Sequence, residues 1–139
     1  FEKYVADKGL KDVCIFTGNI TDRKLLQGYY LRGDLMLFPS VFDMASIAKV
    51  EASAHKKASL VIKDSCSAEE VIDGDNGFLC EENAESLADR ICGLCGEEDK
   101  LKLAGERAHA TLYRTWTDVA KEVYAKYGEI IARHKKLTL

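Results

Sequence analysis

Short apolar runs alternate with helical patterns along the first two thirds of the chain. The apolar runs have strand length and lie at Val13–Thr17, Leu35–Phe38, Ala58–Lys63 and Phe78–Cys80. Helical spacing predicts helices over Glu2–Lys8, from Thr21 and Asp22 onward, from near Ser46 to Ala54, and over Ser65–Ile72. Strands that alternate with helices favour an α/β fold, in which a parallel sheet carries helices on both faces. The near-continuous apolar run at Ala58–Lys63 is typical of a buried parallel strand.

A tight turn precedes the short Phe78–Cys80 run, and beyond that run the chain predicts only helices. Asp73-Gly74-Asp75-Asn76-Gly77 has strong turn chemistry, and Asn83 is a candidate cap for the next helix. In the second helix from the start, a stripe of Leu25, Leu26, Tyr29 and Tyr30 predicts core residues. The last helix places one apolar stripe on its surface, made of Trp116, Val119, Val123, Tyr127, Ile130 and Ile131.

The stretch from Leu35 to Ala52 carries the candidate chemistry. A strand stops at Pro39, a loop holds Asp43, and a helix that opens near Ser46 holds Glu51. The first backbone N–H groups of a helix have no intrahelical partner, so those near Ile47 can bind a phosphate. Carboxylates on either side can accept hydrogen bonds from sugar hydroxyls. By themselves, Asp43 is also compatible with a turn residue and Glu51 with a solvated helix residue.

These residues resemble a known family. Pro39-Ser40, Phe42-Asp43 and, after seven intervening residues, Glu51-Ala52 are similar to the acidic signature of the retaining glycosyltransferases of family 4, which have two Rossmann-like domains in the GT-B arrangement. Further segments follow in the family's order, namely Val13–Gly18, Tyr29–Asp34, Asp73–Phe78 and the Trp116 helix. The chain departs from the family with Asp43 in place of Glu and Ala45-Ser46 in place of Phe-Gly.

The resemblance implies a role for each matching residue. Asp43 is the catalytic candidate, which orients the donor sugar without forming a covalent bond, and Glu51 accepts hydrogen bonds from the ribose. The donor pyrophosphate lies at the helix start formed by Ser46, Ile47 and Ala48, and Gly18 to Ile20 line the base pocket. No metal or other cofactor is implied, because fixed cations and the helix start neutralise the diphosphate.

The same resemblance implies that residues 1–139 are an incomplete C-terminal donor-binding domain that ends in a long helix. The chain begins at Phe1 without a methionine, inside a predicted helix. In the family, an N-terminal acceptor domain and two strand–helix units with the pyrophosphate-binding Arg and Lys come first, so we expect the chain alone to be inactive. The sheet then has a gap between Val13–Thr17 and Leu35–Phe38, which rearrangement or a homo-oligomer can close.

Composition limits the partners. The chain has 139 residues with a net charge of −3 and a pI of about 5.7, which argues against nucleic-acid binding. Five cysteines without a disulfide-like spacing indicate a reducing cytoplasm, where family members can attach to the inner face of the membrane. Cys92-Gly-Leu-Cys95 is best interpreted as two helix-face residues rather than a zinc site. His55, His109 and His134 are expected at the surface.

The predicted function is binding of a nucleotide-sugar donor by a transferase that moves a hexose to a glycan or lipid acceptor. The sequence defines neither the sugar, the nucleotide nor the acceptor. The alternative is a non-catalytic Rossmann-like module that binds a nucleotide or oligomerises, because a fold does not fix a function. Nucleotide-sugar epimerases share the two-domain fold, but the spacing from Asp43 to Glu51 argues against them.

Overall fold

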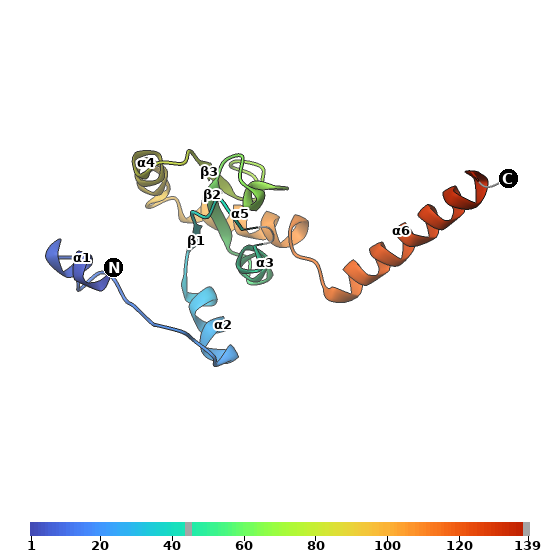
Figure 1. The fold of residues 1–139 in the computed structure, drawn as a ribbon. Coiled ribbons are helices and arrows are strands. Elements are labelled where there is room, and N and C mark those ends of the chain that lie inside the picture. The colour runs from blue at the N-terminus through green and yellow to red at the C-terminus, as the bar shows by residue number, and fades with distance from the viewer. Residues whose placement is uncertain (44–45, 138–139) are drawn as a thin grey trace.

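A computed structural model describes residues 1–43 and 46–137 of the chain. Figure 1 shows a small sheet surrounded by helices, with the N-terminal segment and the last helix extending away from it. The elements in chain order are α1 (Glu2–Asp7), α2 (Arg23–Arg32), β1 (Leu35–Phe38), α3 (Ile47–Ala54), β2 (Ala58–Ile62), the 3-10 helix η1 (Cys66–Ala68), β3 (Phe78–Cys80), α4 (Ala84–Leu94), α5 (Glu98–Thr111) and α6 (Trp116–Leu137).

The sheet has three parallel strands in the order β1-β2-β3. Leu35 of β1 pairs with Ala58 of β2, and Leu60 of β2 pairs with Phe78 of β3. Every residue of the central strand β2 is buried, as the apolar run predicted. The predicted α/β fold with a parallel sheet is therefore confirmed.

Helices cover both faces of this sheet. Leu60 and Ile62 of β2 join a core cluster with Leu94, against which Leu87 and Ile91 of α4 also pack. Val61 points to the opposite face and is completely buried there, on the side where α3 contacts the sheet. Since alternate β2 residues are buried on opposite faces, neither face of the central strand is open to solvent.

Helix α5 approaches the α3–β2 connection very closely. A Cβ atom added to Gly105 would lie 2.1 Å from the carbonyl oxygen of Lys56, which is itself held at a φ of 56°. Ala104 and Ala108 of the same helix are also buried. Small residues on one face of α5 therefore set how near the helix can lie to β2.

Two sequence predictions of secondary structure are wrong. Residues 14–22, which include most of the predicted Val13–Thr17 strand, form no regular structure, and Ile15 is 84% exposed. A strand needs a neighbouring backbone for its hydrogen bonds, and β1 is paired with β2 alone. The predicted Ser65–Ile72 helix is only the short η1, because Glu70 adopts a φ of 65° that no right-handed helix allows.

Some predictions of which side chains are buried are wrong as well. Leu25 and Tyr29 of α2 are exposed instead of buried in the core. His55 and His109 are half-buried instead of at the surface, and each stacks on a tyrosine ring. Tertiary neighbours decide such contacts, and helical periodicity alone does not identify them.

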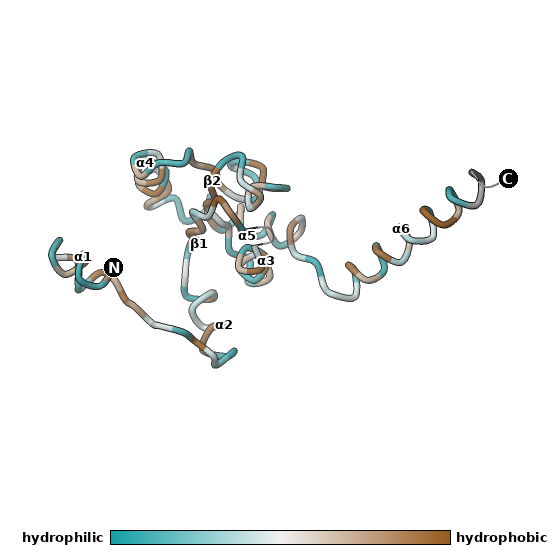
Figure 2. Tube along the Cα trace, viewed as in Figure 1, coloured by the Kyte–Doolittle hydropathy of each residue, from teal (hydrophilic) through white to brown (hydrophobic). Residues whose placement is uncertain are grey.

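The last helix, α6, leaves the folded body after residue 115, and most of its length has no neighbour in Figure 1. Figure 2 shows apolar residues recurring along it. Trp116 is 86% exposed, Tyr127 is 62% exposed and Ile131 is 55% exposed. The predicted apolar stripe is therefore largely uncovered.

Candidate functional site

Helix α3 starts where the sequence predicted, and Ser46 caps it. The Ser46 hydroxyl oxygen accepts a hydrogen bond from the backbone N–H of Lys49 at 3.1 Å, and Ser46 is buried. This bond occupies the N–H of Lys49, which is therefore not available to a phosphate. The N–H groups of Ile47 and Ala48 have no intrahelical acceptor, so these two are the candidate donors for an anion.

Lys49 is a buried cation that sequence reasoning missed. Its ammonium donates hydrogen bonds to the carbonyl oxygens of Ser67 at 2.8 Å and Glu69 at 3.0 Å. Burial lowers the pKa of Lys49, while the charges of Glu70 and Glu69 oppose that shift. The side chain therefore ties α3 to the loop after β2. Lys49 lies three and four residues before the buried Ala52 and Ser53, on the same face of α3. This helical spacing is the feature of the sequence that could have identified Lys49 as buried.

Asp43 lies in the loop that leaves the carboxyl end of β1, and it is half-buried. Ligands of open parallel sheets bind at the carboxyl ends of the strands, so this is a favourable place for a substrate contact. The neighbouring Phe42 is 95% exposed. Met44 and Ala45 lie outside the described residues, and so does the Ala45 part of the departure from the family signature.

Glu51 lies one turn further along α3, and its carboxylate has two partners. Oε1 accepts a hydrogen bond from Arg23 Nη1 at 3.2 Å, and Oε2 accepts one from the Tyr30 hydroxyl at 3.1 Å. Arg23 and Tyr30 both come from α2. Glu51 therefore links α2 to α3, a contact that no local sequence pattern indicated.

Tyr30 is itself held from two sides. Its ring stacks on His55 with ring centres 5.3 Å apart, and His55 Nδ1 lies 2.7 Å from the Glu51 carbonyl oxygen. Burial, together with the hydrogen bond and the negative charge of Glu51, raises the pKa of Tyr30 to about 12. The phenol therefore stays protonated and remains a hydrogen-bond donor at neutral pH.

The structure does not bring Gly18 and Ile20 together with the α3 residues. Both lie in the irregular segment 14–22, which runs from α1 to the end of α2 that is distant from the sheet (Figure 1). Gly18 has a φ of 63°, and Ile20 is half-buried. Their predicted role in a base pocket stays a prediction.

The turn at 73–77 forms as predicted and is anchored by an asparagine. Asn76 is buried, and its Oδ1 accepts a hydrogen bond from Ile72 N at 2.7 Å. Its Nδ2 donates to the Glu70 carbonyl oxygen at 3.0 Å and to the Thr111 hydroxyl at 2.9 Å. Asn76 therefore joins this turn to the end of α5.

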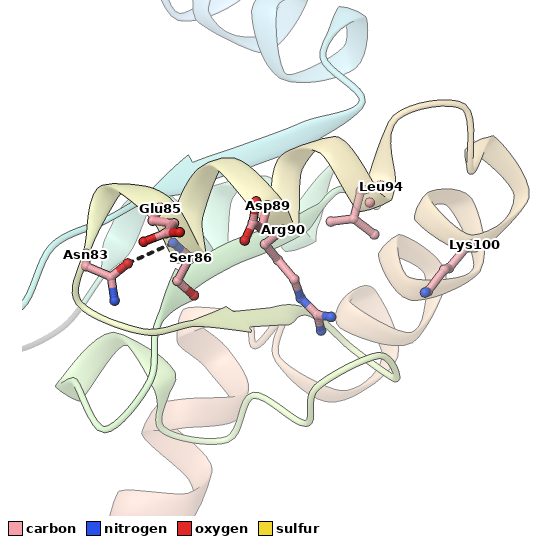
Figure 3. A pocket seen from close by; sticks show the side chains of 8 residues that line it. Asn83, Glu85, Ser86, Asp89, Arg90, Leu94 and Lys100 are labelled. Carbon is pink, nitrogen blue, oxygen red and sulfur yellow. Dashed lines mark hydrogen bonds between the residues drawn. The ribbon is translucent and has the colours of Figure 1, made fainter.

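A surface hollow lies away from the start of α3. A pocket of about 510 Å³ runs along α4 and is lined by Asn83, Glu85, Ser86, Asp89, Arg90, Gly93, Leu94 and Lys100 (Figure 3). None of the sequence-predicted site residues lines it. A smaller apolar hollow of about 210 Å³ lies between residues of α2 and β1 and includes Tyr30.

Within the described ranges, no group of three or more His, Cys, Asp or Glu side chains is placed to hold a metal ion. All five cysteines are free thiols, Cys92 and Cys95 included. None of the described helices has both the length and the apolar character that a membrane span requires.

This chain is similar in sequence and structure to known proteins. Residues 1–111 match the family described as glycosyl transferases group 1. No match to a curated protein sequence was found. Among solved structures, the C-terminal domain of the group 1 protein LpcC from Francisella tularensis is 24% identical with a TM-score of 0.71, over 80% of this chain and 57% of that one.

Two further structures are similar over nearly the whole chain. Sucrose-phosphate synthase from Thermosynechococcus elongatus is 22% identical with a TM-score of 0.79, over 95% of this chain and 34% of that one. HepE from Anabaena, solved in complex with UDP, is 20% identical with a TM-score of 0.78, over 92% of this chain and 35% of that one. The present chain thus spans between about a third and somewhat over half the length of these proteins.

The fold is that of the C-terminal domain of a GT-B glycosyltransferase, as the sequence predicted. The family match covers well over half of the chain, and it includes the whole stretch from β1 to α3 that carries Asp43 and Glu51. The chain belongs to the group 1 glycosyl transferases.

Proposed function

We propose that this domain binds the nucleotide-sugar donor of a retaining hexosyltransferase of family 4. The observation that carries the proposal is the capped start of α3, with Asp43 before it and Glu51 within it, in a chain of the group 1 family. HepE from Anabaena has been solved in complex with UDP and with UDP-glucose, which supports a nucleotide sugar as the ligand.

The chemistry of the proposed reaction fits these groups. When the bond between the sugar and the diphosphate breaks, negative charge develops on the leaving phosphate. The N–H groups of Ile47 and Ala48 point from the positive end of the α3 dipole and can stabilise that charge. In our proposal this helix start and fixed cations neutralise the diphosphate, and no metal or other cofactor takes part.

The two carboxylates have different proposed roles. Glu51 accepts hydrogen bonds from ribose hydroxyls, and Asp43 contacts hydroxyls of the donor sugar. A nucleophilic carboxylate is one route to retention. We instead propose departure and attack on the same face of the sugar, with Asp43 as an orienting and electrostatic group. The glycan or lipid acceptor would lie on a separate N-terminal domain of a cytoplasmic enzyme, so the chain alone is expected to be inactive.

Donor binding by the chain itself tests the proposal. We expect UDP to shift the backbone amide resonances of Ile47 and Ala48 in an NMR titration, in a saturable way. Glu51→Ala should weaken that binding, whereas Glu85→Ala should not, because Glu85 is an exposed acid in the first turn of another helix, α4. An absence of saturable shifts at α3, or equal loss of binding in both variants, would contradict the proposal.

A further inference from the structure

We infer that Tyr30 is a positioning residue for donor binding, which holds one oxygen of the Glu51 carboxylate so that the other faces the ribose. Arg23 occupies that second oxygen until the donor displaces it. The inference rests on the proposed function and adds to it two residues of α2 that the acidic signature does not contain.

The hydrogen bond from Tyr30 to Glu51 is held in place by the packing around the Tyr30 ring. The hydroxyl lies 3.1 Å from Glu51 Oε2, in a half-buried position. The Tyr30 ring is stacked on His55 at an interplanar angle of 11°, and His55 in turn contacts the backbone of Glu51. The phenol therefore has little freedom to move away from the carboxylate, and Oε2 stays occupied.

The ion pair between Arg23 and Glu51, in contrast, is exposed and weakly held. Only Nη1 of Arg23 reaches Oε1, at 3.2 Å, and the Arg23 side chain is 81% exposed. An exposed ion pair held by one hydrogen bond contributes little to stability and is screened by salt. The guanidinium can therefore leave Oε1 at low cost and return when no ligand is present.

This difference determines what the carboxylate offers to a ligand. An ionised carboxylate accepts hydrogen bonds and donates none, and the hydroxyls of a ribose can donate to it. A carboxylate held in one position is therefore a suitable acceptor for them. With Oε2 held by Tyr30, Oε1 is the oxygen that can change partners. Without Tyr30, both oxygens become available to Arg23, whose planar guanidinium can bind a carboxylate with two parallel hydrogen bonds. Loss of Tyr30 should therefore make Arg23 a stronger competitor of the donor.

Four forms of the chain test the inference, with UDP as the probe in the NMR titration described above. We expect Tyr30→Phe to weaken UDP binding about five- to tenfold, which is less than the loss of a direct hydrogen bond to a charged group, because Tyr30 acts on the donor only through Glu51. Arg23→Gln should tighten it about two- to threefold at low salt. In the double variant, the loss caused by Tyr30→Phe should be smaller than in the unmodified background, because the competitor is gone.

The matched control is Tyr29→Phe. Tyr29 is the next residue on α2, is exposed and has no hydrogen bond to Glu51, so UDP binding should be unchanged. If Arg23 had only a structural role, the effect of Arg23→Gln on UDP affinity would not depend on salt. We expect instead that the higher UDP affinity of Arg23→Gln disappears at high salt, where the ion pair is screened.

Each outcome decides the inference. Unchanged binding in Tyr30→Phe, equal weakening in Tyr29→Phe, or weaker binding in Arg23→Gln would overturn it, while Glu51-dependent binding would leave the proposed function intact. Absence of UDP binding in the unmodified chain would overturn the proposed function and this inference together. Thermal unfolding of each variant separates a binding loss from a folding loss.

Discussion

At the scale of single residues, the two acidic side chains are not equivalent. Glu51 is fixed by α2 on a regular helix, whereas Asp43 lies in a loop at the end of β1. In the proposed function, Glu51 on a rigid helix makes a ribose contact that is the same before and during the reaction. Asp43 in its loop makes a contact to the donor sugar that tightens as charge develops.

We therefore predict a kinetic difference in the transferase that contains this domain. Glu51→Ala should raise the donor KM strongly, because ribose contacts are equal in the ground and transition states. Asp43→Ala should mainly lower kcat. Steady-state kinetics with varied donor concentration measures both effects, and an equal reduction of kcat alone in the two variants would count against the assignment.

Gly105 should tolerate no side chain. A methyl group there would lie 2.1 Å from the carbonyl oxygen and 2.8 Å from the carbonyl carbon of Lys56, and these backbone atoms cannot rotate away as a flexible side chain can. We expect Gly105→Ala to destabilise the fold by about 3 kcal/mol, at the upper end of overpacking costs. The control is Gly93→Ala in α4, where the space is open and a stabilisation of about 0.5–1 kcal/mol is expected. Urea unfolding measures both, and similar stability of the two variants would contradict this packing.

Tyr30 should make stability depend on pH in the alkaline range. Its pKa is raised from 10.0 to about 12 in the folded chain, so the folded state holds the proton more tightly than the unfolded state. The stabilisation is then fully present below pH 10 and is lost as the pH rises toward 12. The difference in unfolding free energy between the unmodified chain and Tyr30→Phe should shrink over this range, and a constant difference would show that folding does not raise the pKa of the phenol.

At the scale of elements, short segments are held together by side chains that form hydrogen bonds with distant segments. Lys49 joins α3 to the loop after β2, and Asn76 joins the 73–77 turn to α5. These bonds replace regular secondary structure in the region from Ser65 to Ile72, where the sequence predicted a helix and the chain forms mostly turns.

Asn76→Ala should test this arrangement. It removes the acceptor for Ile72 N and the donor for the Glu70 carbonyl oxygen, and leaves both groups without that partner. We expect a loss of about 1–3 kcal/mol, the cost of buried unsatisfied polar groups. Asn19→Ala, at an exposed position of the irregular segment, should change stability very little. Chemical denaturation compares them, and equal stability would mean that the turn holds without its asparagine.

At the scale of the whole molecule, two surfaces can take a partner. One is the apolar stripe of α6, which is largely exposed, and the other is the edge of β1, whose backbone is paired with β2 alone within the described residues. Burial of one Leu or Ile side chain contributes roughly 1.5–3 kcal/mol, so contact between such surfaces is favourable.

We predict that the chain self-associates through α6, the open sheet edge, or both. Light scattering over a concentration series should show an increase in mean mass. Tyr127→Lys, which places a charge in the exposed α6 stripe, should weaken the association if α6 is the contact. A strict monomer at high micromolar concentration would mean that α6 folds back onto its own domain.

The sequence by itself determined the features that depend on local rules. The helix starts at Asp22 and near Ser46, the Asn83 cap, the 73–77 turn and the buried β2 strand all formed as predicted. Each needs only a side chain and its neighbours in sequence or a continuous apolar run. The family signature also lay in the sequence, since Asp43 and Glu51 flank one helix start.

Tertiary structure alone decided the features that need a partner from elsewhere in the chain. Residues 13–17 have strand-forming composition but stay irregular, because no neighbouring strand supplies their backbone hydrogen bonds. The same holds for the site. The links from Glu51 to Arg23 and Tyr30 span 28 and 21 residues, and only the packing of α2 against α3 brings those side chains within hydrogen-bond distance.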